Sequence, residues 1–414
     1  MPPPLSLLSG RKDVVTTQPS TTLEENIGEA TSPTGQEAPQ RSSSVFTFWQ
    51  GRVALYGILK ALGLGPGDRV LVPGYTCFAV PSTVFFAGAQ ADYVDIDPDT
   101  LNISLRRIEA SCGPHTRAIL VQHTYGVPAN TFPIVEWAHQ HGIAVIEDCA
   151  HALGSRYLDR EGGWRAVGTA GDAAFFSSHW TKPVSTGLGG WATAANPGVE
   201  ARLRQFHDEV CVSPSWREAA LLAAQVAARR LTSSPCLYWV VRRAYQWSYR
   251  RNLLIGSSTG EELRGVMPAG YCKRMSPFQE WLRRRLLATA TFEAHRRLLK
   301  NLYDRALADA GLPVVQIPEY ADAVLLRYPV RVGNKNHVLA EAQRRWIELG
   351  DWYKHPVDRP EDSSVADFGY RTGMCPEGER ASRETVTLPM HQKVTERVAL
   401  RMVDFLRQVG RPIP

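Results

Sequence analysis

From residue 46 onward, short apolar runs alternate with stretches of helical spacing, and this alternation most constrains what the chain can fold into. Strand-like runs are predicted at residues 69–72, 91–96, 117–121, 143–146 and 173–176. Helical spacing is predicted at residues 52–62 and 131–141. Strands that are joined through helices need crossover connections, which favour a parallel sheet covered on both faces. The sequence therefore predicts an α/β fold built on a large, mostly parallel sheet.

The rest of the chain predicts three further segments around this large domain, which we place at residues 45–200. Residues 1–44 are rich in Pro, Ser, Thr, Gly and Glu without an apolar period, and we expect a flexible arm. Residues 275–414 predict a smaller C-terminal α/β domain. Its expected elements are a long Leu- and Arg-rich helix from about residue 275, a strand at 324–332, and helices at 338–349 and 395–409.

Positive charge is concentrated in residues 201–274, which we interpret as an Arg-rich helical insertion and linker. Nine arginines and three acids lie between Ala201 and Arg251, so this local excess of +6 equals the net charge of the whole chain. The remainder is about neutral, which predicts no nucleic-acid partner. Within residues 237–251, apolar side chains form a helical stripe beside four arginines. Such a helix either packs with a solvated arginine face or makes a weak contact with a membrane surface, and both interpretations stay open.

Composition and cysteine spacing are typical of a globular protein in a reducing cytoplasm. The hydrophobic share is 44% and the charged share 21%, which is typical of globular proteins. The longest uncharged stretch, 70–91, is interrupted by Pro73, Gly74, Pro81 and Gly88, so we do not expect it to span a membrane. Seven scattered cysteines without CxxC spacing predict neither a disulfide framework nor a metal site. We see no secretory leader and expect a cytoplasmic protein.

Polar residues follow the ends of several predicted strands, where ligands collect in open parallel sheets. Asp148 follows the strand at 143–146, and residues 177–182 follow the strand at 173–176. A lysine for the aldehyde, a carboxylate for the ring nitrogen and a cradle for the phosphate are what pyridoxal phosphate (PLP) needs from a protein. Taken singly, such an aspartate is more often a helix cap, and such a lysine is more often a solvated surface group.

The order of several motifs resolves that ambiguity, because the chain resembles the DegT/StrS family of PLP-dependent sugar aminotransferases from about Gly51 to its last helix. Six stretches carry the resemblance: GPGDRVLVPGYT (65–76), AGAQADYVDIDPDTLNI (87–103), HTYGVPAN (123–130), IEDCAHALGSRY (146–157), FSSHWTKPVSTGLGG (176–190) and CPEGERASRETVTLPMH (375–391). The resemblance implies a fold of the aspartate aminotransferase type, with PLP as the cofactor and Lys182 holding it as a Schiff base. A lysine at this position favours transamination, since relatives that dehydrate sugars carry histidine there.

The resemblance also implies roles for other residues. Asp148 matches the carboxylate at the pyridine nitrogen, and His151 matches the residue near the ring hydroxyl. Ser177 matches a phosphate-binding serine, while Gly51 and Arg52 occupy the start of the phosphate-binding helix. We expect Arg52 to contact the phosphate, because a cation in a first helical turn is unfavourable without an anion.

Three positions depart from the family pattern. Cys77, with Phe78 beside it, stands where the family places the aromatic ring that stacks on the cofactor. Cys272 replaces the asparagine that a partner subunit extends to the phosphate, and Leu188 replaces a common glutamate. For His123 and His179, a site role and an ordinary structural role are equally favoured.

We therefore expect a homodimer with shared active sites that transfers an amino group from an amino-acid donor, with glutamate as the donor implied by the resemblance, to a nucleotide-linked keto sugar. The alternatives are a keto-cyclitol or other non-nucleotide acceptor, and a non-catalytic PLP-binding regulatory protein. The first 45 residues contain no helix-turn-helix pattern that would favour the regulatory protein.

Overall fold

The computed structural model describes residues 44–232, 255–289, 291–358, 368–411 and 413. The predicted arm, except Ser44, and the whole predicted helix at 237–251 lie outside these residues. The helices of the described part include none that is long and apolar enough to cross a membrane.

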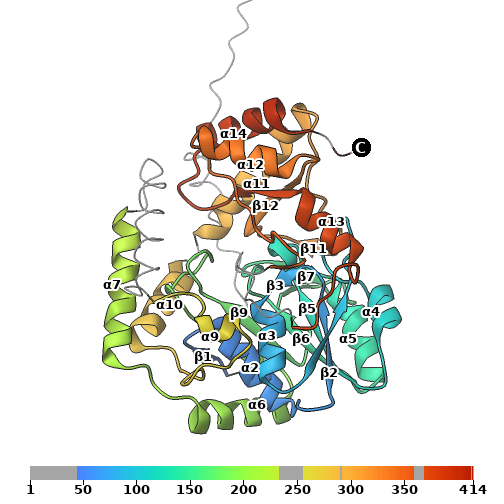
Figure 1. Ribbon diagram of the computed structural model, residues 1–414, viewed down its shortest axis with the longest axis vertical. Helices are drawn as coiled ribbons and strands as arrows, with labels where there is room; N and C mark the ends of the chain where they lie inside the picture. Colours follow the sequence, from blue (N-terminus) through green and yellow to red (C-terminus); the bar gives the residue numbers. More distant parts are fainter. Residues whose placement is uncertain (1–43, 233–254, 290, 359–367, 412, 414) are drawn as a thin grey trace, which may run out of the picture.

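A seven-stranded sheet forms the centre of the large domain, in the order β1-β10-β9-β6-β5-β2-β4 (Figure 1). Its strands are β1 Phe46–Phe48, β2 Arg69–Pro73, β4 Gln90–Val94, β5 Thr116–Gln122, β6 Ala144–Asp148, β9 Ala173–Ser177 and β10 Gly190–Ala194. Within this sheet β10 alone runs in the direction opposite to the other six strands. This mostly parallel sheet confirms the predicted fold class, and each predicted strand of the large domain matches an observed one to within two residues at either end.

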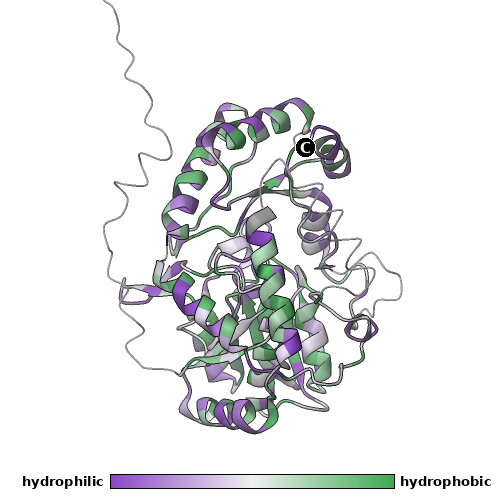
Figure 2. Ribbon diagram, turned by 90° about the vertical axis from the view of Figure 1, so that its left-hand side faces the viewer, coloured by the Kyte–Doolittle hydropathy of each residue, from purple (hydrophilic) through white to green (hydrophobic). Residues whose placement is uncertain are grey.

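Alternate residues of the central strands face two different layers of helices, which explains why the strands are apolar throughout. In β2, Val70 and Val72 pack toward α2 (Gly51–Ala61) and α3 (Ala79–Phe86). Leu71 packs on the other face, toward α4 (Leu105–Ser111) and α5 (Thr131–Gln140). Figure 2 shows the resulting concentration of apolar segments inside the larger body of the molecule.

A second core lies around the two-stranded antiparallel sheet of β12 (Arg327–Arg331) and β14 (Thr385–Pro389). The helices packed around it are α11 Phe292–Asp309, α12 Lys335–Arg344 and α14 Glu396–Val409. The division of the chain into domains at the predicted boundaries stays a prediction.

Three expectations for this C-terminal part differ from the structure. The expected long helix is two helices, α10 (Pro277–Thr289) and α11. Of the expected strand at 324–332, only β12 (Arg327–Arg331) pairs with another strand, β14. The backbone before β12 binds the large domain instead, since the Leu326 N–H donates to the Tyr125 carbonyl. Helix α12 ends at Arg344 instead of 349, and Trp346 follows with a φ of 57°, which ends the helical path.

The remaining elements lie around and between these two cores. They comprise β3 Thr76–Cys77, η1 Thr124–Gly126, β7 Arg156–Leu158, β8 Trp164–Ala166, α6 Pro197–Gln205, η2 Phe206–Val210, α7 Trp216–Thr232, α9 Gly260–Leu263, β11 Ala321–Asp322, β13 Val357–Asp358 and α13 Pro376–Glu384. The pairing of β13 with β3 is parallel and joins Asp358 to Cys77 in register. This pairing brings the segment 351–358 against the end of the central sheet, where it forms part of the site described next.

Candidate active site

A cavity of about 650 Å³ opens beyond the carboxyl ends of β5, β6 and β9. Every site residue predicted from the sequence lines it: Gly51, Arg52, Cys77, Phe78, Asp148, His151, Ser177 and Lys182. These residues come from four separate parts of the sequence, 51–52, 77–78, 148–151 and 177–182, so the fold brings the predicted set together. The role of each residue stays a prediction.

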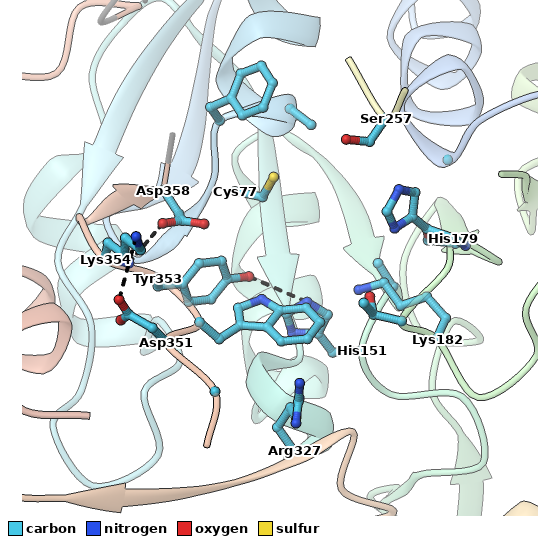
Figure 3. Close-up of a pocket in the computed structure, with 18 of the residues that line it drawn as sticks. Cys77, His151, His179, Lys182, Ser257, Arg327, Asp351, Tyr353, Lys354 and Asp358 are labelled. Atoms are coloured by element: carbon cyan, nitrogen blue, oxygen red, sulfur yellow. Dashed lines mark hydrogen bonds and ion pairs between the residues drawn. The ribbon is translucent and has the colours of Figure 1, made fainter. Parts of the chain in front are cut away.

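Lys182 lies in the loop that follows β9, and its side chain points into the cavity (Figure 3). Its backbone N–H donates to the His179 carbonyl at 2.9 Å. Burial lowers the pKa of the amine to about 8, although the nearby carboxylate of Asp148 acts in the opposite direction. A lysine with a lowered pKa has a larger neutral fraction near neutral pH, which is the form that can attack an aldehyde.

Asp148 is the last residue of β6 and is almost fully buried. One of its oxygens, Oδ1, accepts a hydrogen bond from the Ala150 N–H at 2.9 Å. Burial raises the pKa of this carboxyl group to about 6, partly opposed by the Ala150 hydrogen bond and by the charge of Lys182. A nearby cation, such as a protonated ring nitrogen, would stabilise a buried carboxylate of this kind.

His151 packs against Tyr125 and Tyr353, whose own ring centroids lie 5.9 Å apart, so the three rings form a cluster. Its ring is nearly parallel to those of Tyr125 and Tyr353, with centroids 6.2 and 5.9 Å away. Nδ1 accepts from the Tyr125 N–H at 3.3 Å, so the ring proton lies on Nε2, which faces the Tyr353 hydroxyl at 3.5 Å. Burial lowers the pKa of His151 well below its ordinary value, and the imidazole is therefore neutral.

Gly51, Arg52 and Ser177 line the part of the cavity where the sequence predicts a phosphate, which we call the phosphate end. A Cβ on Gly51 would lie 3.1 Å from the Cβ of Ser177, so glycine permits the close approach of α2 to the end of β9. Arg52 already has a partner within the chain: its Nη1 lies 2.9 Å from Glu262 Oε1. Burial lowers the pKa of Arg52, but the charge and hydrogen bond of Glu262, together with Tyr271 and Cys77, outweigh burial, and the pKa is raised overall.

The three departures from the family pattern occupy different environments. Cys77 is half-buried and lines the cavity, and the adjacent Phe78 ring lies under the Arg52 guanidinium at 5.6 Å. Cys272 is buried in the core beside α2 and does not line this cavity. Leu188 is fully buried, and its carbonyl accepts from Gln279 Nε2 at 3.1 Å.

For His123 and His179 the sequence favoured a site role and a structural role equally, and the structure places only His179 at the cavity. His123 is fully buried outside the cavity, where Nδ1 accepts from the Ala129 N–H and Nε2 donates to Glu147. His179 lines the cavity, and its buried Nε2 has no hydrogen-bond partner in the described residues. Burial lowers the pKa of His179 to about 3, so this ring is neutral and retains one unused polar atom near the phosphate end.

Several cavity residues come from the C-terminal part and were missed by the sequence reasoning. They are Arg327, Asp351, Trp352, Tyr353, Lys354 and Asp358. Tyr353 has a φ of 62°, a conformation that is costly for an aromatic residue and is held here by packing against Tyr75 and His151. Residues 351–358 reach the cavity through the β13–β3 pairing, a contact across about 280 residues that no local pattern predicts.

Comparison with known proteins identifies what this arrangement resembles. The family model for the DegT/DnrJ/EryC1/StrS aminotransferase family matches residues 41–407. A GDP-perosamine synthase from Caulobacter vibrioides is 39% identical over 154 residues, which are 37% of this chain and 40% of that protein. An L-glutamine:2-deoxy-scyllo-inosose aminotransferase from Streptomyces kanamyceticus is 40% identical over 156 residues, which are 38% of this chain and 35% of that protein. These two matches therefore span less than half of either relative.

A solved structure extends the likeness to most of the chain. The structure of DesV from S. venezuelae, described as a complex with a ketimine intermediate, superposes with a TM-score of 0.66 at 25% sequence identity. The likeness covers 88% of this chain and 84% of DesV.

Proposed function

The chain belongs to the DegT/DnrJ/EryC1/StrS aminotransferase family, as its sequence motifs predicted, and from this membership we propose that it is a PLP-dependent transaminase that transfers an amino group from an amino-acid donor to a keto sugar. One observation carries the assignment to this cavity. Lys182 and Asp148 line the same buried space, and burial shifts both pKa values toward neutrality, to about 8 and about 6. Shifted pKa values of this kind concentrate at catalytic sites.

The described residues fit PLP at each of its functional groups. PLP, when bound, acts as an electron sink for the bonds around the amino-bearing carbon. Lys182 would supply the amine that holds the aldehyde carbon and would move a proton as a general base and acid. Asp148 would keep a proton on the ring nitrogen, and neutral His151, which carries its proton on Nε2, would donate a hydrogen bond to the ring hydroxyl. Gly51, Arg52, Ser177 and the unused Nε2 of His179 supply polar groups at the phosphate end.

The donor amino acid would be oriented by Arg327, which enters the cavity from the C-terminal sheet. Its guanidinium lies over the Trp352 ring at 5.5 Å, and its buried Nη1 has no hydrogen bond within the described part of the chain, although Glu348 Oε1 lies 3.9 Å away as an ion-pair partner. A planar guanidinium with an unused donor suits a carboxylate. This arrangement supports an amino-acid donor such as glutamate, whose carboxylate would otherwise be buried without a counter-ion.

The acceptor would meet a mixed polar group at the cavity wall. Asp351, Lys354 and Asp358 lie together there, and the Lys354 N–H donates to Asp358 Oδ1 at 2.8 Å (Figure 3). Carboxylates and amines of this kind can hydrogen-bond sugar hydroxyls. We propose a nucleotide-linked keto sugar first and a keto-cyclitol second, because the relatives named above act on acceptors of both kinds. Homodimerisation with shared sites and a cytoplasmic location belong to the same proposal.

An amino-transfer assay tests this function. The purified protein is given glutamate and, in separate reactions, GDP- and UDP-linked keto sugars, keto-inositols and a buffer blank, and 2-oxoglutarate is measured. Turnover with one acceptor class identifies the acceptor. A protein that binds PLP but releases no 2-oxoglutarate from glutamate with any of these acceptors would favour the regulatory alternative.

A further inference from the structure

The second residue of α2 forms a buried ion pair with a short segment that lies 206–210 residues further along the chain. Arg52 Nη1 lies 2.9 Å from Glu262 Oε1 and 3.1 Å from Ser258 Oγ. The side chains of Arg52 and Glu262 are 11% and 3% exposed. The residue before α2 adds a further contact, from Gln50 Nε2 to the Ser257 carbonyl at 3.4 Å. The segment 257–262 is therefore attached to the start of α2 at the phosphate end of the cavity.

The carboxylate of Glu262 is fixed from two sides. Thr259 begins α9 with a capping box, in which the Thr259 N–H donates to Glu262 Oε2 at 2.7 Å and the Glu262 N–H donates to Thr259 Oγ1 at 3.2 Å. Oε2 thus binds its own helix while Oε1 binds Arg52. A carboxylate held in this way has little freedom to move away from the guanidinium.

Arg52 nevertheless keeps unused donors. In the described residues its hydrogen bonds involve Nη1, whereas a guanidinium offers five N–H groups on three nitrogens. Arg52 also lines the cavity beside Ser177 and His179. A phosphate at this end would therefore bind the free edge of a guanidinium whose charge Glu262 already balances.

We propose that Glu262 is a positioning residue that holds Arg52 at the phosphate end and lowers the affinity of that end for phosphate. This inference rests on the proposed function for the identity of its natural ligand. Glu262→Gln removes the negative charge of residue 262 but keeps the shape of its side chain. The variant still offers Arg52 an oxygen to bind, but the positive charge of Arg52 is no longer balanced. The apoprotein becomes less stable, because a buried charge has lost its partner. Phosphate binds more tightly, because one negative charge beside it is gone.

The test measures dissociation constants of inorganic phosphate by calorimetry for the full-length protein in phosphate-free, PLP-free buffer, and of PLP by absorbance after equilibrium dialysis. We expect Glu262→Gln to bind both about tenfold more tightly than the wild type, and to show a lower unfolding temperature without phosphate. The matched control is Glu261→Gln, which removes the same charge from the exposed neighbouring position of α9. It should change neither affinity by more than about twofold. Weaker or unchanged phosphate binding in Glu262→Gln would overturn the inference.

A second pair of variants tests the inference even if Glu262→Gln does not fold. Arg52→Gln leaves Glu262 as an unbalanced negative charge near the phosphate, and Arg52→Gln/Glu262→Gln removes both charges. We expect the double variant to bind phosphate more tightly than Arg52→Gln and less tightly than the wild type. Equal affinities for the single and double variants would show that Glu262 has no effect on the ligand. If the phosphate affinities follow the expected order but no lysine-bound PLP forms, the inference stands and the proposed function fails.

Discussion

The amine of Lys182 lies over the indole ring of Trp352, with Nζ 5.1 Å from the ring centroid. Lys182 follows a strand of the large sheet, whereas Trp352 belongs to the segment that reaches the cavity through β13. The guanidinium of Arg327 lies 5.5 Å from the same ring. One aromatic side chain therefore lies close to both the lysine expected to hold the cofactor and the arginine expected to orient the donor.

Replacing Trp352 should impair catalysis without unfolding the protein. A cation over an indole ring is stabilised by roughly 0.5–2 kcal/mol, and two such contacts are lost in Trp352→Ala. We expect kcat/KM for amino transfer to fall by at least about tenfold, with a smaller loss in Trp352→Phe. Trp281→Ala removes an exposed tryptophan of α10 and serves as the control. Equal kinetics in Trp352→Ala and Trp281→Ala would show that the ring does not organise the site.

The rate at which the apoprotein incorporates PLP should rise with pH and level off above a midpoint near 8. The neutral amine is the reactive form, and burial lowers the pKa of Lys182 to about 8. At pH 7 roughly one such lysine in ten is neutral, far more than for an exposed lysine with a pKa of about 10.4. Stopped-flow absorbance between pH 6 and 10 measures the profile. A rate that is still rising steeply at pH 10 would contradict the buried site.

Asp148→Asn should slow the half-reaction with glutamate by orders of magnitude, because a neutral amide does not keep the ring nitrogen protonated. The carboxylate also raises the pKa of Lys182, so the midpoint of PLP incorporation should move to lower pH in the variant. Rapid-mixing spectra with glutamate measure the first effect and the pH profile above measures the second. A variant with the wild-type half-reaction rate would place the functional carboxylate elsewhere.

His179 should make the apoprotein sensitive to mild acid. Burial lowers its pKa to about 3 from an unfolded value of 6.5, so below pH 6.5 the unfolded state binds a proton that the folded state does not. The free energy of unfolding therefore falls as pH falls from 6.5, by at most about 1.4 kcal/mol per pH unit from this residue. In urea unfolding between pH 7 and 4.5, His179→Gln should lose less stability than the wild type. His115→Gln, at an exposed histidine, should follow the wild type, and a shared profile for all three proteins would refute the assignment.

The large sheet could be predicted from the sequence because apolar runs are a local pattern, whereas the residues of the candidate site came from the resemblance of several motifs to a family. Apolar runs indicate the strands, and residues at or beyond the carboxyl ends of parallel strands share one edge of the sheet, as do Asp148, the last residue of β6, and Lys182, in the loop after β9. Long-range pairings were missed. Nothing near Trp352 indicates that β13 pairs with β3, and nothing near Arg52 indicates Glu262 as its partner. One local signal was available for the latter, since Thr259 and Glu262 have the spacing of a capping box and indicate a helix start.

The central claim is that Lys182 holds PLP and that an amino donor releases it, and one measurement tests this most directly. Wild-type protein and Lys182→Ala are incubated with PLP, reduced with borohydride before or after glutamate is added, and digested for mass spectrometry. The account predicts a pyridoxyl group on the Lys182 peptide of the wild type when reduction comes first, its loss when glutamate comes first, and no attachment in Lys182→Ala. A pyridoxyl group on another lysine, or attachment to Lys182 that persists after glutamate, would contradict it.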